Sequence, residues 1–311
     1  MESIIEVILQ AGHSVIDLSL YTLLPIMIVM LIVMRGLEAY GILSWIVKLL
    51  SKISKPFGLN GFGVLAMIQI SFISFAGPIP TLALMDRNGT SDRYLAATFA
   101  TVLAMAPANA LFPMAALGLP AGITLLYSLI GGLFAASSVY WCFGLKLSNV
   151  SHEICLDKTN LEKPAKSILD IINKGGAEAV RVIFNVIPML LISLTVVVAL
   201  QRMGAITFLQ HFFLPAFQYL HLDPQLLLPT LTKLLAGGTA LVSVVHSIAQ
   251  TGQPYTNLIS PAAAGFLLHP FDLPGLAIFL SAAPRLARLL GPSLLGAVFG
   301  LLVRVLLGAY F

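Results

Sequence analysis

Two stretches decide the fold: MAPANALFP (residues 105–113) and LHPFDLPGL (residues 268–276). Each sets a proline, Pro107 or Pro270, inside an apolar run. Proline lacks a backbone N–H donor and clashes with the preceding turn, so a helix that meets it kinks or stops. The paired stretches therefore predict two interrupted helices at corresponding positions of two similar halves.

The offset between Pro107 and Pro270 recurs along both halves. The matched pairs are Pro25 with Pro188, Gly41 with Gly204, Leu59 with Leu222, Gly89 with Gly252, Asn109 with Asp272 and, one residue out of register, Gly144 with Gly308. Each match alone is weak, because proline and glycine are common in this chain. A nearly constant offset indicates an internal duplication. In an apolar chain, duplication is typical of secondary transporters, whose two repeats enclose a site near the membrane midplane.

Composition places the chain in a membrane. Of its 311 residues, 58% are hydrophobic and 10% are charged, and the mean hydropathy is +0.96, whereas soluble domains carry about 25% charged residues. The length leaves room for roughly eight to ten membrane segments. We expect a multi-pass protein of the bacterial inner (cytoplasmic) membrane, surrounded by the lipid bilayer. No basic run with interleaved aromatic residues occurs, so nucleic acid is not an expected partner.

Signatures of enzymes and metal sites are missing from the sequence. There is no HExxH, GxSxG or P-loop motif, and the two cysteines, Cys142 and Cys155, suggest neither a disulfide framework nor a metal site. We expect no enzyme, no metal and no cofactor, other than a coupling proton or sodium ion. A membrane-embedded enzyme that uses His246, His269 and Asp272 is a minor alternative.

One charged segment divides the chain. Residues 145–174 hold nine of the formal charges, five of them lysines, and lysine-rich connections favour the cytoplasmic side. We predict that this segment is a cytoplasmic linker between a first repeat, residues 1–144, and a second repeat, residues 175–311.

The first repeat is predicted to cross the membrane three times. Lys48, Lys52 and Lys55 share one face of the stretch 42–55, the pattern of an interfacial helix. Broken backbone at membrane depth is tolerated only where protein or a watery cavity surrounds it. The expected elements are a crossing helix (18–35), the interfacial helix (42–55), a re-entrant hairpin broken at 77–80, an interrupted crossing (94–117) and a returning crossing (120–143).

Charge placement predicts that the second repeat is inverted. The stretch 205–222 has no lysine or arginine where the first copy has the lysine-rich helix, whereas Arg285 and Arg288 stand where the first copy is uncharged. A parallel repeat, the alternative, requires similarly basic loops in both copies. The fold class is therefore an all-α membrane protein of two inverted repeats, each with about three transmembrane helices, an interfacial helix and a re-entrant helical hairpin. Its second copy comprises a helix (176–201), an outer interfacial helix (205–222), a hairpin with its tip at 236–238, a broken span through 269–270 and a final helix (289–310).

Three stretches resemble the nucleoside-recognition or Gate family, whose relatives include spore maturation proteins A and B, the gate regions of ferrous-iron permease B and, more distantly, concentrative nucleoside transporters. They are SFISFAGPIPTLALM (71–85), SDRYLAATFATVLAMAPANALFP (91–113) and GPSLLGAVFGLLVRVLLG (291–308). The resemblance implies a Gate-like fold in each half and a nucleoside-like solute as one candidate. The acidic and amide residues that hold base and ribose in nucleoside transporters are not found here, nor is the G-domain of the iron permease.

The helix breaks predict a binding site. An interrupted helix exposes N–H groups at one stub and C=O groups at the other, and such ends can bind anions or cations without an ionised side chain. We predict a solute or ion site where the four breaks meet. The alternative is that proline and glycine only kink these helices for packing.

Two ionisable residues stand out at membrane depth, where a charge is costly. Lys233 can bind an anionic solute or pair with Asp272; the alternative is that it snorkels to the interface. Asp272 can bind a cation or carry a coupling proton, and the alternative is that it caps a helix stub or lies near the cytoplasmic surface. Neighbouring His269 suggests a proton relay. The predicted site consists of Gln69, Ser74, Gly77, Pro78, Asn109, Lys233, Gly237, Gly238, His246 and Asp272.

For the uncharged members of this set, the alternative is a purely structural role. Serine and other small polar side chains often satisfy backbone carbonyls within their own helix, and His246 can be a hydrogen-bonded structural histidine. The sequence favours a permease that moves a small polar solute or ion by alternating access. The runner-up is a non-transporting accessory subunit or an assembly or signalling scaffold of the spore-maturation type, and a homodimer or a partner membrane subunit fits either. A transporter requires the polar residues to converge, whereas a scaffold does not.

Overall fold

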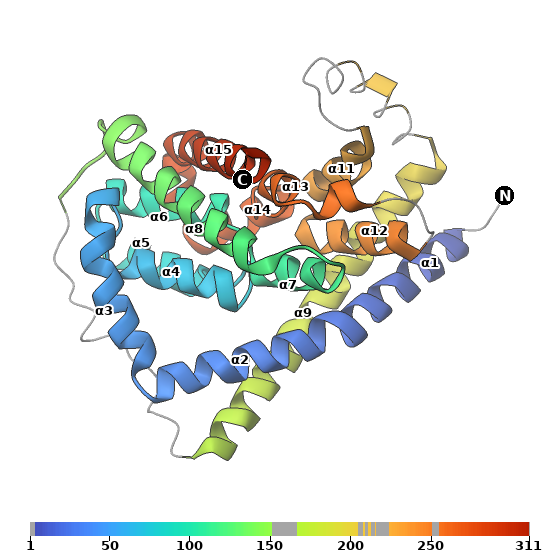
Figure 1. The fold of residues 1–311 in the computed structure, drawn as a ribbon, viewed down its shortest axis with the longest axis horizontal. Helices are drawn as coiled ribbons and strands as arrows, with labels where there is room; N and C mark the ends of the chain where they lie inside the picture. Colours follow the sequence, from blue (N-terminus) through green and yellow to red (C-terminus); the bar gives the residue numbers. More distant parts are fainter. Residues whose placement is uncertain are drawn as a thin grey trace.

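The computed structural model describes residues 4–150, 167–204, 224–250 and 255–310, together with Phe208, His211, Phe212 and Pro215. These described residues form helices and connecting turns, with no strand among them (Figure 1). The predicted all-α class is confirmed at this level. Most of the predicted outer interfacial helix (205–222) and most of the charged linker fall outside the described residues.

The first half of the chain folds into a series of helices separated by short turns. In order, they are α1 (Ile4–Ile16), the π-helical turn η1 (Asp17–Leu23), α2 (Leu24–Ala39), α3 (Ile42–Ser54), the 3-10 turn η2 (Lys55–Phe57), α4 (Gly61–Phe72), α5 (Ile79–Arg87), α6 (Asp92–Ala104), α7 (Ala108–Ala116), α8 (Ala121–Ser138) and the π-helical turn η3 (Val139–Phe143).

The helices of the second half repeat several boundaries of the first. They are α9 (Ile168–Arg202), the 3-10 turn η5 (Pro224–Leu226), α11 (Leu227–Ala236), α12 (Gly238–Gln250), the 3-10 turn η6 (Thr256–Ile259), α13 (Pro261–Leu267), α14 (Leu273–Ala282) and α15 (Leu286–Tyr310). The offset that relates Pro107 to Pro270 also relates the two longest helical stretches. Applied to the first and last residues of the continuous stretch Ile5–Ala39, it gives the first and last residues of α9. The last residues of α5 and α6 likewise match the last residues of α12 and α13.

The first long helix differs from its predicted extent. A helix over 18–35 was expected, but the helical stretch runs from Ile5 to Ala39. Pro25 does not stop it, because the π-helical turn η1 ends just before this proline and changes the bonding pattern where a donor is missing. The counterpart α9 is also longer than the predicted 176–201 and carries Pro188 inside.

These two long helical stretches lie against each other and run in opposite directions (Figure 1). Near one end, Arg35 Nη2 of α2 lies 2.9 Å from Glu178 Oε2, early in α9. Near the other end, Arg202 Nη2 at the close of α9 donates to Gln10 Oε1 of α1 over 2.8 Å. The start of each stretch therefore meets the end of the other.

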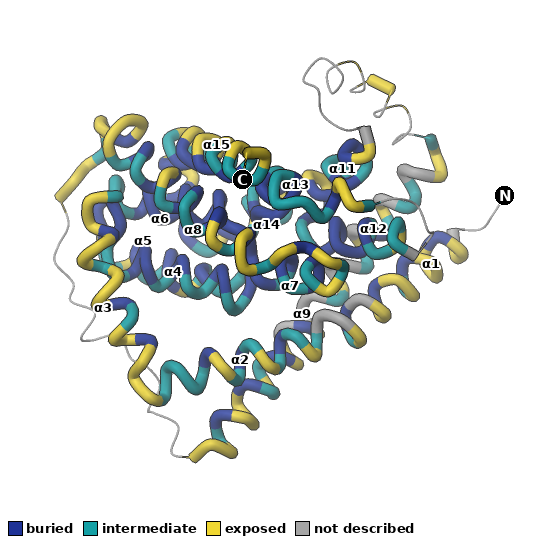
Figure 2. The backbone as a smooth tube through the Cα atoms, viewed as in Figure 1, coloured by how far each residue is buried: buried dark blue, intermediate teal, exposed yellow. Residues whose placement is uncertain are grey.

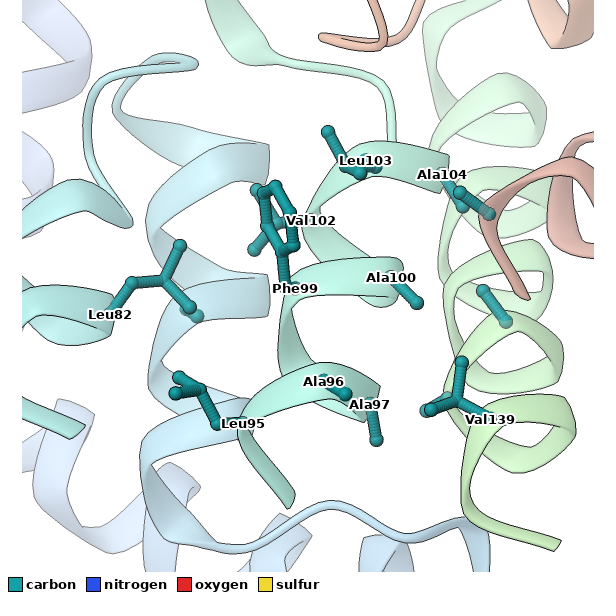
Figure 3. Close-up of a cluster of buried hydrophobic side chains, with 14 of the residues drawn as sticks. Leu82, Leu95, Ala96, Ala97, Phe99, Ala100, Val102, Leu103, Ala104 and Val139 are labelled. Atoms are coloured by element: carbon teal, nitrogen blue, oxygen red, sulfur yellow. The ribbon is translucent and has the colours of Figure 1, made fainter. Parts of the chain in front are cut away.

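Helix α6 is deeply buried among its neighbours (Figure 2). All ten of its residues from Leu95 to Ala104 are buried. Figure 3 shows Leu95 and Phe99 on the side of Leu82, whereas Ala97 and Ala100 lie on the side of Val139. Alanine on that face brings the neighbouring backbone close, as is common where membrane helices pack.

Close helix packing also joins α8 to α15. A Cβ placed on Gly300 of α15 would overlap the backbone oxygen of Gly131 of α8. Only glycine fits where two backbones approach this closely. The last helix is thereby held directly against the first half.

Four helical stretches of the described chain are long and apolar enough to cross a membrane: Ile5–Ala39, Asp92–Ala116, Ala121–Phe143 and Leu286–Tyr310. The described part of the chain therefore has the makeup of a multi-pass membrane protein. The predicted break in the Asp92–Ala116 stretch is present, because α6 ends at Ala104 and α7 begins at Ala108.

Candidate functional site

The first half places its polar residues around the turn between α4 and α5. Gln69 Oε1 on α4 accepts a 2.8 Å hydrogen bond from Thr81 Oγ1 on α5, and so ties the two helices together. Ser74 Oγ accepts from Ala76 N within the turn, over 3.2 Å. A Cβ on Gly77 would lie 3.0 Å from the Gln69 carbonyl oxygen, so glycine allows the turn to fold back on α4. Pro78 immediately precedes α5.

The break between α6 and α7 meets this turn through one side chain. Asn109, in the first turn of α7, accepts a 3.0 Å hydrogen bond from the backbone N–H of Phe75 through its Oδ1. The amide therefore holds together the two interrupted segments of the first half. This contact places Asn109 beside the turn that holds Ser74 and Gly77.

The second half contains a buried ion pair. Lys233 Nζ of α11 lies 2.6 Å from Asp272 Oδ2, and the two side chains are only 1% and 5% exposed. Asp272 Oδ1 also accepts from Gly275 N over 2.7 Å and caps the start of α14. Asp272 therefore both pairs with Lys233 and caps a helix stub. The snorkelling alternative for Lys233 is wrong, because its ammonium group is buried.

A glycine at the break lets the carboxylate come close. Gly237 has φ +89°, a conformation that favours glycine, and its N–H donates to the Lys233 carbonyl over 2.9 Å. A Cβ there would lie 3.7 Å from Asp272 Oδ1. Asp272 thus faces the junction of α11 and α12 just as Asn109, its match in the first half, faces the turn between α4 and α5.

The two sets of breaks are adjacent. A Cβ on Gly238, the first residue of α12, would lie 3.6 Å from the Cβ of Ala110, which follows Asn109 in α7. Helices α7 and α12 pack together. The interrupted segments of the two halves therefore lie next to each other through Gly238 and Ala110. We call the polar and break residues on either side of this contact the break cluster: Gln69, Ser74, Gly77, Pro78, Asn109, Lys233, Gly237, Gly238 and Asp272.

The two histidines considered as site residues, His269 and His246, lie in different surroundings. His269 Nδ1 accepts from Phe271 N over 3.1 Å, and its Nε2 lies 2.9 Å from the Phe266 carbonyl oxygen. These partners fix the neutral Nε2–H tautomer and leave neither nitrogen for a relay with Asp272. His246 is only partly buried and lies eight residues after Gly238, ~12 Å along α12. The structure therefore does not bring His246 into the break cluster.

Arg304 of α15 is a buried cation that the sequence analysis missed. It is 1% exposed, and its Nη1 donates to the carbonyls of Ala104 (2.6 Å) and Leu268 (2.9 Å). Its Nη2 donates to Ala264 over 3.1 Å. A single arginine inside the apolar run 291–308 was the available signal, because a charge at membrane depth is costly.

A second arginine connects the halves outside the break cluster. Arg285, between α14 and α15, donates to the Asp86 carbonyl (3.1 Å) and the Thr90 carbonyl (2.9 Å), and it pairs with the Asp92 carboxylate. These partners lie at the end of α5, in the turn that follows it and at the start of α6. The end of α14 therefore lies beside that turn.

Comparison with known proteins identifies the fold but not a sequence family. No protein-family model matches the sequence, and no curated protein matches it. A solved structure of CNTnw, a concentrative nucleoside transporter, in an inward-facing substrate-bound state has a TM-score of 0.67 at 14% identity, over 98% of this chain and 83% of that one. A CNTnw variant in an intermediate state has a TM-score of 0.66 at 14% identity, over 93% and 76% of the chains.

An outward-facing CNTnw variant has a TM-score of 0.66 at 15% identity, over 98% of this chain and 83% of that one. At this identity the likeness shows the fold alone. The chain folds like a concentrative nucleoside transporter over nearly its whole length.

Proposed function

We propose that this protein is a multi-pass inner-membrane transporter of a small polar solute or ion, and not an enzyme. Two inverted repeats, residues 1–144 and 175–311, enclose the site, and residues 145–174 connect them as a cytoplasmic linker. The observation that carries the proposal is the break cluster, in which a buried Lys233–Asp272 pair lies where interrupted helices from both halves meet. A scaffold has no need for such convergence.

Two sets of contacts support the inverted arrangement. The matched stretches Ile5–Ala39 and α9 run antiparallel, as inverted copies of one helix would. Arg285 contacts the turn that holds Asp86 and Asp92. An inverted second copy places Arg285 on the cytoplasmic side with that turn, whereas a parallel copy would place it across the membrane.

Helix length supports two re-entrant hairpins. Helices α4 and α5 have 12 and 9 residues, and α11 and α12 have 10 and 13. A helix needs about 20 residues to cross the hydrocarbon core, so none of the four spans it alone. We infer that α4–α5 and α11–α12 enter and leave on the same side, with their tips in the break cluster.

The fold supports alternating access as the mechanism. The CNTnw structures that resemble this chain are in inward-facing, intermediate and outward-facing states, so the shared architecture is one that opens to either side. In such a cycle the tips of the hairpins move relative to a shared site, which is exposed to one side at a time.

The ion pair suggests the kind of solute. An ammonium group offers three donors and a carboxylate offers acceptors, so together they form a site of no net charge that can bind a solute carrying both donors and acceptors. A nucleoside is one such solute. An anionic group would instead compete with Asp272 for Lys233.

Uptake into proteoliposomes tests the proposal. The purified protein is assayed with a panel of nucleosides, organic anions and divalent metals, with and without a proton or sodium gradient. We expect saturable uptake of at least one solute above that of protein-free liposomes. If the folded protein moves none of these solutes, the proposed transport function is wrong and the accessory-subunit alternative is favoured.

A further inference from the structure

Arg304 lies where two interrupted helices end. Ala104 is the last residue of α6, and Ala264 and Leu268 are in the last turn and at the C-cap of α13. The two ends correspond between the halves, since Ala104 matches Leu267 at the offset of the internal duplication. The guanidinium therefore joins the C-terminal ends of two matched helices, midway along the Asp92–Ala116 stretch.

Helix C-termini favour cations. The last carbonyls of a helix commonly lack a partner within the helix, and the helix dipole gives that end a partial negative charge. Here the Ala264 carbonyl also accepts from the Leu268 N–H over 2.9 Å, so Arg304 uses its second lone pair. In membrane transporters, the C-terminal ends of interrupted helices commonly coordinate a coupling cation. Three carbonyl oxygens that converge within 2.6–3.1 Å of one guanidinium have the makeup of such a cation site.

The surroundings are shaped to hold this arginine. Cβ atoms on Gly131 or Gly265 would overlap its stem or its backbone, so glycine at both positions leaves room for it. No carboxylate lies within ion-pair distance of Arg304 among the residues that the structure describes. Within the same residues, its Nε has no hydrogen-bond partner. Backbone carbonyls alone therefore compensate the buried charge.

We propose that Arg304 is a tethered cation, whose guanidinium occupies the place that a free monovalent cation would take at these carbonyls. The wild-type fold then needs no bound metal ion between α6 and α13. Removal of the side chain leaves an open carbonyl site that accepts Na⁺, K⁺ or free guanidinium. This proposal has a consequence for transport, which rests on the proposed function: sodium binding at this position does not drive the movement of solute.

Thermal unfolding of the purified protein tests the proposal without any transport assay. Melting temperatures of wild type and of Arg304→Ala are measured in choline chloride, NaCl, KCl and choline chloride with millimolar guanidinium. We expect the wild type to be unaffected by the cation. We expect Arg304→Ala to melt roughly 5–10 °C lower in choline and to recover saturably with at least one of the small cations.

Two further variants make the test decisive. Arg288→Ala removes an exposed arginine from the same helix and should neither lower the melting temperature nor confer cation dependence. Arg304→Lys keeps a tethered positive charge; it should remain foldable and indifferent to Na⁺. If Arg304→Ala cannot be purified in choline, its yield with and without Na⁺ or guanidinium replaces the melt.

Two outcomes would overturn the proposal that Arg304 is a tethered cation. One is an Arg304→Ala protein that none of the small cations restores; the other is a wild type that Na⁺ itself stabilises as strongly as the variant. A wild type without any uptake would remove the proposed function but leave the thermal result standing.

Discussion

Lys233 and Asp272 are each costly to bury alone, and the structure holds them together at 2.6 Å. Removal of one partner from such a pair strands the other charge, which destabilises a protein by about 3–5 kcal/mol, whereas replacing both partners by neutral groups is often well tolerated. The pair is therefore better explained by a role in the site than by a need for stability.

Substitutions at this pair should separate stability from function. Lys233→Met should lower the free energy of unfolding by about 3–5 kcal/mol and abolish uptake. Adding Asp272→Asn should restore most of the stability, because asparagine also caps helices well, but no uptake. Thermal melts and proteoliposome uptake measure the two effects. An unchanged uptake in either variant would mean that Lys233 has no part in binding.

Two adjacent glycines offer a matched test of the break between α11 and α12. Gly237→Ala forces a side chain into a backbone conformation (φ +89°, ψ 177°) that essentially only glycine adopts, which costs about 1–3 kcal/mol. Gly238→Ala places its Cβ 3.6 Å from Ala110, an ordinary contact, and should be nearly neutral. The two melting temperatures are compared directly; equal values would argue against this backbone geometry.

Sequence reasoning identified some of these residues and not others. A lone lysine and a lone aspartate in apolar runs are visible in the sequence, and so is their potential pairing. Arg304 was equally visible, but its partners are backbone carbonyls of distant helix ends, which no side-chain pattern reveals. His246 was included for its residue type, and its place along α12 keeps it away from the break cluster.

At the scale of elements, helix breaks were easier to predict than helix lengths. Proline and glycine mark the ends of α6 and α11 within a few residues, because their backbone chemistry acts locally. The long stretch Ile5–Ala39 was predicted too short at both ends, although its continuation through Pro25 was expected.

The contact between α8 and α15 gives a test at this scale. Gly300→Ala would push a methyl group into the Gly131 backbone and should cost about 1–3 kcal/mol through overpacking. Gly122→Ala, in the partner helix α8 with open space around it, should be neutral or stabilise by up to about 1 kcal/mol. Chemical or thermal unfolding of both variants checks the difference. A tolerated Gly300→Ala would show that the two helices lie further apart.

At the scale of the whole molecule, the halves are joined by charged contacts outside the break cluster. Arg304 also joins them, because it links the C-terminal ends of α6 and α13. Arg35 with Glu178 and Arg202 with Gln10 fix the two long helices, and Arg285 fixes the end of α14 to the first half. The constant offset between matched residues was apparent in the sequence. The contacts that express it in space were not, because they join residues far apart in the chain.

The opposite orientation of the two halves is the claim on which the shared site depends, and labelling of single cysteines tests it most directly. In a Cys142→Ser, Cys155→Ser background, Arg87→Cys at the end of α5 and Thr256→Cys in η6 are exposed to a membrane-impermeant thiol reagent, before and after the membrane is opened. Inverted repeats predict that Thr256→Cys reacts in intact cells, whereas Arg87→Cys reacts only after permeabilisation. Labelling of both positions from the same side would contradict the inverted arrangement.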